Sequence, residues 1–238
     1  MDNATYATLT RQSGLRDELQ TLAHNIANVS TNGYQRAGLI FSEFVERLDP
    51  ADEGLSMATA RAWMTDRSQG QLVQTGGQFD FAIEGNGYFM VETAAGQRLT
   101  RAGAFSPNAA GELVTADGAR LLDAGQTPVF IPAGVQKIHM ADDGTLSADG
   151  QPLTQIGLFL PADPVDLRRE EGTRFAVEGD IDPLVNGQVI QGFLEQSNVD
   201  PIVEISRLIE VQRAYEAGRN LLNAEDERIR NVVRTLTT

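Results

Sequence analysis

Histidines and adjacent carboxylates are the side chains of this sequence that could transfer protons or bind a metal ion. The two histidines, His24 and His139, lie far apart, and neither belongs to an HExxH motif or to a pair spaced for zinc. Asp142-Asp143 and Glu170-Glu171 are adjacent acidic pairs of the kind that can serve as general acid and base. Both pairs stand beside glycine in turn-like stretches, where carboxylates are usually solvated. These residues therefore predict no catalytic centre.

Two glycine-containing segments could bind phosphate or calcium. Gly85-Asn86-Gly87 lacks the third glycine of a dinucleotide fingerprint, and no βαβ unit follows it. Asp142-Asp143-Gly144 lacks the spaced ligands and the closing glutamate of an EF-hand. The chain has no cysteine, which excludes disulfides and thiolate metal sites. The sequence therefore predicts no catalytic residue, no cofactor, no metal and no small-molecule substrate, and hence no enzyme.

The charge of the chain is unevenly distributed. The net charge is −14, and all of it lies in residues 41–200, because the segments 1–40 and 201–238 each carry equal numbers of basic and acidic residues. An acidic chain repels phosphates, so a nucleic-acid partner is not expected. Neutral ends can pack together without net repulsion. No apolar run reaches the roughly 18–20 residues of a membrane span, and the N-terminus lacks the pattern of a cleaved signal peptide.

Proline and glycine divide the chain into three parts. All nine prolines lie between Pro50 and Pro201, and few of the 23 glycines lie near either end. Because both residues break helices and form turns, the sequence predicts helices at the ends and strands between them. We therefore expect an α+β protein with a mostly-β central domain. The predicted parts are a discontinuous terminal helical domain (1–35 and 201–238), a linker or extension (36–74) and a β-rich core domain (75–200).

Apolar residues of the first segment follow a heptad-like spacing of 4, 3, 4 and 3, which predicts a helix with a narrow apolar seam. These residues are Leu15, Leu19, Leu22, Ile26 and Val29. We expect the helix to run from about residue 3 to residue 29. Gly33 follows in a turn-like stretch and is expected to adopt a positive φ.

The last segment predicts a longer helix. Asp200-Pro201 provides an N-cap carboxylate followed by proline at the first helical position. A second apolar seam then repeats every seven residues, with polar Gln212 at one of its positions. Its members are Ile205, Leu208, Gln212, Tyr215, Leu222, Ile229, Val233 and Leu236. Two amphipathic terminal helices could pack on their own domain, but the narrow seams favour pairing of the helices as a coiled-coil-like bundle.

The central segment alternates short apolar runs with turn residues. Residues 79–83 and 88–91 flank Gly85-Asn86-Gly87 and predict a hairpin. Asp117-Gly118 and Asp149-Gly150 each lie between two short apolar runs and predict two further hairpins. Residues 49–56 are predicted to form a linker or loop.

Three motifs resemble the flagellar rod and hook family. Residues 22–34, LAHNIANVSTNGY, resemble the family's N-terminal signature, with His24 where the family usually has asparagine. Residues 81–118 are similar to the family's central segment. Residues 191–199, QGFLEQSNV, followed by 209–216, IEVQRAYE, resemble its C-terminal motif. The three matches stand in order across nearly the whole chain. The opening residues and the short length are most similar to F-type proximal rod proteins.

The resemblance implies a structural subunit of the basal-body rod in the periplasm, which transmits motor torque. It implies export by the flagellar type III apparatus without a cleaved signal peptide, and contacts with other rod subunits and with copies of the same chain. The implied turn motif is Thr31, Asn32, Gly33 and Tyr34. The implied assembly interface comprises Leu15, Leu19, Leu22, Asn25, Ile26, Asn28, Val29, Ile205, Leu208, Gln212, Tyr215, Leu222, Ile229, Val233 and Leu236.

Three other functions remain open from the sequence. A distal rod subunit shares the central and C-terminal motifs. A binding or adaptor module outside the flagellum would form a stable heterodimer. A hydrolase would need converging carboxylates in a substrate-sized pocket, and no motif supports one.

Overall fold

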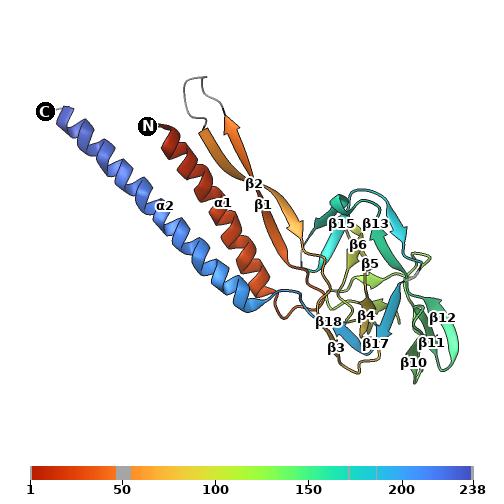
Figure 1. Ribbon diagram of the computed structural model, residues 1–238. Helices are drawn as coiled ribbons and strands as arrows, with labels where there is room; N and C mark the ends of the chain where they lie inside the picture. Colours follow the sequence, from red (N-terminus) through yellow and green to blue (C-terminus); the bar gives the residue numbers. More distant parts are fainter. Residues whose placement is uncertain (1, 47–54, 171, 186, 237–238) are drawn as a thin grey trace. The chain divides into compact units, whose positions relative to one another are not determined.

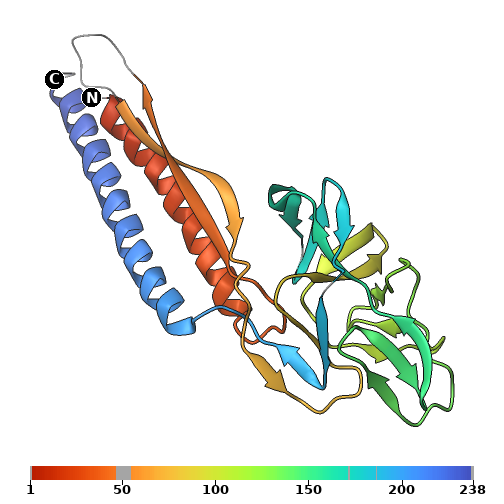
Figure 2. The same ribbon diagram turned by 45° about the vertical axis from the view of Figure 1, so that its right-hand side comes forward.

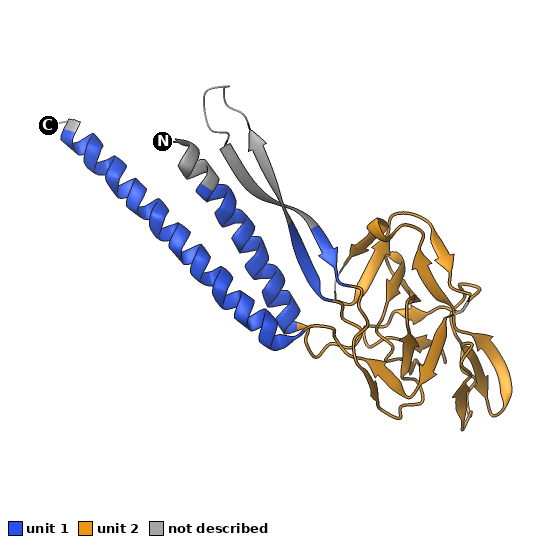
Figure 3. Ribbon diagram, in the orientation of Figure 1, with its two compact units in different colours: residues 1–27, 36–66, 200–238 blue, residues 28–35, 67–199 orange. Residues whose placement is uncertain are grey.

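The computed structural model describes residues 2–46, 55–170, 172–185 and 187–236. The chain divides into two compact units that each combine separate segments (Figure 3). Unit 1 contains residues 1–27, 36–66 and 200–238, and unit 2 contains residues 28–35 and 67–199. Unit 1 holds both helices, and unit 2 is largely β-structure, so the fold is α+β, as the sequence predicts. Figure 1 labels the elements along the chain.

Unit 1 is formed by two long helices and a hairpin. Helix α1 spans Asp2–Ala27, and helix α2 spans Pro201–Leu236. The predicted cap of α2 is confirmed, because the Asp200 carboxylate accepts hydrogen bonds from the backbone N–H groups of Ile202 (2.9 Å) and Val203 (3.3 Å). The two helices lie side by side and run antiparallel, as both views show (Figures 1 and 2).

The segment that follows the first helix contains a β-hairpin. Strand β1 (Ala37–Glu46) pairs antiparallel with β2 (Leu55–Thr65), from Ala37 opposite Thr65 to Glu46 opposite Leu55. The register shifts between Ile40 and Phe41, which marks a bulge. Both strands belong to unit 1 together with the helices. The predicted linker at 49–56 falls mainly on residues 47–54, which lie outside the described residues.

Unit 2 contains the remaining strands. The largest sheet has the order β14-β15-β6-β5-β9-β8-β7, and β13 joins β5 to β16. Three smaller sheets have the orders β10-β11-β12, β17-β4 and β18-β3. The strands are β3 (Leu72–Gln74), β4 (Phe81–Glu84), β5 (Tyr88–Thr93), β6 (Gly96–Thr100), β7 (Ser106–Pro107), β8 (Leu113–Val114), β9 (Arg120–Leu121), β10 (Ile138–Met140), β11 (Thr145–Ala148), β12 (Gln151–Gln155), β13 (Leu158–Pro161), β14 (Leu167–Arg169), β15 (Arg174–Val177), β16 (Ile181–Pro183), β17 (Gln188–Gln191) and β18 (Phe193–Glu195), with a short 3₁₀ helix at Pro164–Asp166.

Strand β5 separates the two hydrophobic clusters of unit 2. Phe89 and Val91 belong to the larger cluster, and Tyr88 and Met90 belong to the smaller one. Successive side chains of a strand point to opposite faces, so β5 contributes to both clusters. This explains why residues 88–91 read as a continuous apolar run rather than an alternating one.

The predicted hairpins have different outcomes. The two Asp-Gly turns are confirmed: β8 pairs with β9 around Gly118, and β11 pairs with β12 around Asp149 and Gly150, which both have positive φ. The predicted hairpin around 85–87 is wrong, because β4 pairs with β17 and β5 pairs with β6. The Arg101 guanidinium donates to the carbonyls of Gly85 and Gly87, so this segment is a loop held by a side chain.

Candidate assembly surface

A polar junction joins the three parts of unit 1. The side-chain amide of Asn25, which is fully buried, pairs with the backbone of Ala37 in both directions: its Oδ1 accepts from the Ala37 N–H (2.9 Å), and its Nδ2 donates to the Ala37 carbonyl (2.8 Å). The same Nδ2 donates to Glu204 Oε2 at 3.0 Å. Asn25 therefore connects α1 with the start of β1 and with the first turn of α2.

Glu204 completes this junction. Its side chain is 1% exposed, and its Oε1 accepts from Arg36 Nε at 2.5 Å. The Arg36 side chain is 34% exposed. A buried carboxylate is costly unless it is paired and hydrogen-bonded, and here both oxygens have a donor. Among the predicted interface residues, Asn25 is thus placed at a buried point where α1, β1 and α2 meet.

Hydrogen bonds define an antiparallel register between the two helices. Gln12 Nε2 donates to the Tyr215 carbonyl at 3.0 Å, and Arg207 pairs with Glu18 at 2.8 Å. Together with the bond from Asn25 to Glu204, these contacts place progressively earlier residues of α1 opposite later residues of α2. Because α1 begins at Asp2, the same register places the first residue of α1 opposite about residue 225 of α2.

The seam of α2 differs from the predicted one by one residue at every second position. The inward positions recur with spacings of 4 and 3, and they are buried or half-buried. They are Glu204, Leu208, Val211, Tyr215, Gly218, Leu222 and Glu225. Predicted Leu208, Tyr215 and Leu222 belong to this set, whereas Ile205 and Gln212 lie one residue after it and are exposed. Gln212 donates instead to Glu216 on the same helix.

Among the side chains of α1 that the structure describes, Leu22 is the most deeply buried apolar one, at 4% exposure, and Val211 on α2 is 2% exposed. The other predicted apolar residues of α1 are half-buried: Leu15, Leu19 and Ile26. Gly218 allows a close approach of α1, because a Cβ at this position would lie 1.9 Å from Gln12 Nε2. The amide of Gln12 thus occupies the space that a side chain at position 218 would take.

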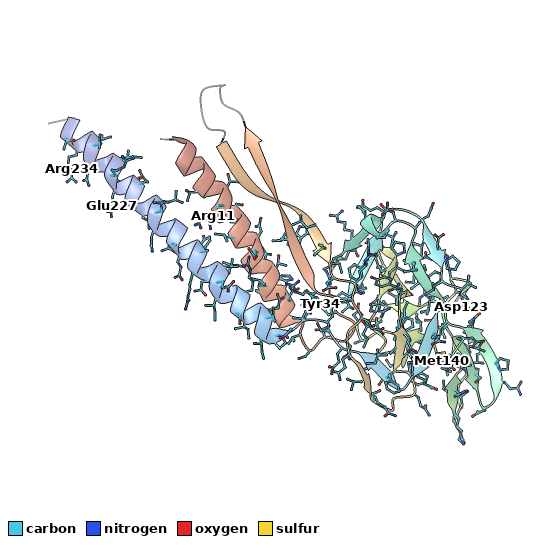
Figure 4. All side chains as sticks on the ribbon, viewed as in Figure 1. Arg11, Tyr34, Asp123, Met140, Glu227 and Arg234 are labelled. Atoms are coloured by element: carbon cyan, nitrogen blue, oxygen red, sulfur yellow. The ribbon has the colours of Figure 1, made fainter. Side chains whose placement is uncertain are left out.

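Apolar side chains of α2 remain exposed at both ends of the helix. Ile205 is 45% exposed, and Ile229 and Val233 are each 55% exposed. The last two lie beyond the part of α2 that α1 covers. Figure 4 shows Glu227 and Arg234 on these last turns. The side chain of Leu236 lies outside the described residues. An aliphatic surface of this kind on a helix is typical of an interaction site.

The predicted turn motif belongs to unit 2. Asn28 and Val29 follow the end of α1, and Thr31 donates from its backbone N–H to the Asn28 carbonyl and from its hydroxyl to Asn28 Oδ1. Asn32 is half-buried. Gly33 has a φ of 69° and donates to the Glu195 carbonyl at 2.7 Å. A Cβ on Gly33 would lie 2.3 Å from the backbone nitrogen of Ala102, so only glycine fits there.

Tyr34 anchors the segment after this turn. It is 3% exposed, and the guanidinium of Arg169 lies 4.8 Å from its ring centroid and 4.7 Å from that of Phe175 (Figure 4 labels Tyr34). The Arg169 guanidinium also donates to the Gln35 carbonyl, and Tyr88 donates to Gln35 Oε1 at 3.0 Å. Burial lowers the pKa of Arg169. Cation–π contacts and these hydrogen bonds hold the segment in unit 2.

A buried ion pair lies beneath the same turn. Arg101 and Glu195 are separated by 2.7 Å, and their side chains are 3% and 2% exposed. Glu195 also accepts from the backbone N–H of Gly70 at 3.1 Å. Every charged group of this pair is therefore hydrogen-bonded, as a buried pair requires. Arg101 and Glu195 therefore stabilise the fold beneath the turn.

Within the described segments, no group of three or more His, Asp or Glu residues is arranged to hold a metal ion.

Comparison with known proteins identifies the family. The family described as "Flagellar hook protein FlgE/F/G D1 domain" matches residues 82–148, and "Flagellar basal body rod FlgEFG protein C-terminal" matches residues 190–235. The flagellar basal-body rod protein FlgF of Caulobacter vibrioides is 35% identical, over 99% of this chain and 98% of that protein. The chain belongs to the flagellar rod and hook family.

Other members of the rod and hook family show where this chain falls within it. FlgF of Mesorhizobium japonicum is 33% identical over 99% of the chain and 98% of that protein. FlgG of Agrobacterium fabrum is 34% identical over 88% of the chain and 90% of that protein. The F-type resemblance seen in the opening residues thus extends over the full length. In the described part of the chain, neither helix is long and apolar enough to cross a membrane.

Proposed function

We propose that this chain is a non-enzymatic structural subunit of the bacterial flagellar basal-body rod, in its proximal part. The observation that carries the proposal is its similarity to FlgF-type rod proteins over nearly the whole of both sequences. As a rod subunit, the chain lies in the basal body and forms part of the periplasmic shaft that transmits motor torque. Its partners are other rod subunits and copies of itself, and it reaches them through the flagellar type III export apparatus without losing a signal peptide.

In this proposal, unit 1 is the assembly domain. Helices α1 and α2 pair as a coiled-coil-like bundle, and the exposed apolar residues at the two ends of α2, Ile205, Ile229 and Val233, contact neighbouring subunits. The junction of Asn25 with Ala37 and Glu204 fixes how β1 leaves the helices. The turn from Thr31 to Tyr34 anchors the end of the N-terminal segment in unit 2.

The alternative within the family is a distal rod subunit, which the FlgG similarity keeps open. The test that separates the two is the position of the chain in the rod. A label on the chain in isolated basal bodies, located by electron microscopy, is expected at the motor side of the rod. A label at the hook side would replace the proximal assignment with the distal one.

Two adjacent leucines of α2 test the role of the seam. Leu222 is half-buried on the seam, whereas Leu221 is 53% exposed beside it. We expect Leu222→Asp to abolish swimming and to remove the chain from isolated basal bodies, while unit 2 stays folded. Leu221→Asp is the matched control and should retain incorporation. Equal incorporation of the two variants would mean that the α1–α2 seam is not needed for assembly.

A further inference from the structure

A short segment of unit 2, residues 84–87, reaches the surface but is held from inside the unit; we call it the surface loop. Its residues are exposed except for Gly87. The Arg101 guanidinium donates to the Gly85 carbonyl at 2.9 Å and to the Gly87 carbonyl at 2.7 Å. The Gly85 N–H donates to Gln69 Oε1 at 3.1 Å. One buried cation therefore fixes the backbone of a loop that faces solvent.

The same guanidinium is tied to a buried carboxylate. Arg101 and Glu195 form an ion pair at 2.7 Å, and their side chains are 3% and 2% exposed. Burial raises the pKa of Glu195, although the neighbouring arginine opposes this shift. The pair thus lies in a strongly desolvated place, where two charges are stable only while their hydrogen-bond partners are present.

The segment 28–35, which we call the strap, lies directly on the backbone of Arg101. The Gly33 N–H donates to the Glu195 carbonyl at 2.7 Å. A Cβ on Gly33 would lie 2.4 Å from the carbonyl carbon of Arg101 and 2.6 Å from its oxygen. The strap packs in unit 2, although the residues on either side of it in the sequence belong to unit 1. It therefore covers the residue whose side chain fixes the surface loop.

We propose that the strap and the surface loop are coupled through Arg101 and Glu195, so that the loop keeps its shape only while the strap is docked. Undocking removes the Gly33 hydrogen bond from Glu195 and exposes the ion pair to water. A hydrated guanidinium no longer needs the two loop carbonyls as acceptors, and the loop opens. Because the coupling of two sites is reciprocal, opening of the loop also loosens the strap.

In a rod subunit, this coupling is a device that orders the surface loop only on a chain whose N-terminal segment is in place. A partner that contacts the loop then binds the ordered chain in preference to one with an undocked strap. This use of the coupling rests on the proposed function. The coupling itself is a property of unit 2 and can be measured in the purified full chain.

Because the chain has no cysteine, a single introduced thiol can report on the surface loop. Asn86→Cys carries a nitroxide spin label, and electron paramagnetic resonance measures its mobility. Gly33→Ala places a Cβ against Arg101 and should displace the strap. We expect the label to become more mobile and the Gly85 amide to exchange faster by about tenfold or more. Gly118→Ala is the matched control, because Gly118 also has a positive φ but faces open space, and it should change neither readout.

Arg101→Lys tests whether the arginine is the connection. Lysine keeps the charge but lacks the planar fork that binds the carboxylate and the loop carbonyls together. The loop should already be mobile in this variant, so that Gly33→Ala adds little to the mobility of the label. An effect of Gly33→Ala as large as in the chain with Arg101 would show that Arg101 does not connect the strap with the loop.

Gln69→Ala approaches the coupling from the loop and introduces no clash, so it decides the matter even if Gly33→Ala unfolds unit 2. The exposed Gln69 side chain also donates to the Ile83 carbonyl at 2.6 Å. Reciprocity predicts that its loss speeds exchange of the Gly33 amide, while the amides of β11 stay protected and show that unit 2 remains folded.

The coupling is wrong if exchange of the Gly33 amide is unchanged in Gln69→Ala. It is also wrong if the label at position 86 stays as immobile in Gly33→Ala as in the Gly118→Ala control. Either result leaves the proposed function standing. The proposed function fails instead if the unmodified chain is absent from isolated basal bodies.

Discussion

Removal of the Glu204 carboxylate tests whether the polar junction holds unit 1 together. Glu204→Ala takes one acceptor from Asn25 and one from Arg36. A hydrogen bond to a charged group contributes about 1.5–3 kcal/mol, and loss of one partner of a buried pair costs about 3–5 kcal/mol. Asn25 keeps its bonds to Ala37, and Arg36 is one-third exposed, so water recovers part of the loss. We therefore expect the free energy of unfolding of unit 1 to fall by about 2–4 kcal/mol.

The matched control is Glu210→Ala on the same helix. The Glu210 side chain is 69% exposed and makes one ion pair with Arg207 at 3.3 Å, which is worth about 0–1 kcal/mol. Urea unfolding followed by the helical circular dichroism signal and by fluorescence of Trp63, the only tryptophan, reports on unit 1. A double-mutant cycle with Arg36→Ala isolates the pair. The reasoning is refuted if Glu204→Ala loses no more stability than Glu210→Ala.

Three further changes have expected outcomes. Gly33→Ala should destabilise unit 2 by more than about 2 kcal/mol, because the new Cβ combines a positive φ with a backbone clash. Gly118→Ala is the control and should cost about 1 kcal/mol, because Gly118 also has a positive φ but a Cβ there would lie in open space. Equal losses of stability in thermal melts would argue against the close packing of the turn at Gly33. Gly218→Ala should change stability by less than about 1 kcal/mol, because a gain of about 1 kcal/mol in helix propensity opposes the loss of the Gln12 hydrogen bond; a large loss in chemical denaturation would mean that the helices cannot adjust. Burial alone would raise the pKa of Asp123, but hydrogen bonds from Thr127, Thr154 and the Gly125 N–H lower this pKa below its ordinary value of 3.8. The ionised carboxylate therefore stabilises unit 2 at neutral pH, and this stabilisation is lost as the pH falls below 3.8. The melting temperature of Asp123→Asn should depend less steeply on pH in that acidic range than the melting temperature of the unmodified chain, and an unchanged slope would contradict this assignment.

Features that depend on local patterns could be predicted from the sequence. The helical ends follow from the placement of proline and glycine, and the Asp200 cap and the two Asp-Gly hairpins follow from residues with strong local preferences. The family could be recognised because each of its three motifs is confined to a short stretch of the sequence. The positive φ of Gly33 is also predictable, although the reason for glycine there is a close approach to Ala102 that no local pattern reveals.

The remaining features depend on contacts between distant segments. The burial of Glu204 could not be predicted, because a charged residue is not expected at a buried seam position. Glu204, Val211 and Gly218 do follow the seven-residue spacing of the seam. The pairing of β4 with β17 joins residues about one hundred positions apart, and a local turn signal favoured the wrong partner. Residues 28–35 pack in unit 2 through Glu195, Arg169 and Tyr88, none of which is near them in the sequence.

Amide hydrogen exchange tests most directly whether unit 1 is the assembly element. The purified full chain is compared with the same chain in isolated basal bodies, peptide by peptide. We predict that residues 226–236 of α2 exchange rapidly in the free chain and are strongly protected in the rod, whereas the strands of unit 2 change little. Rapid exchange of 226–236 in both states, or a gain of protection confined to unit 2, would contradict assembly through the terminal helices.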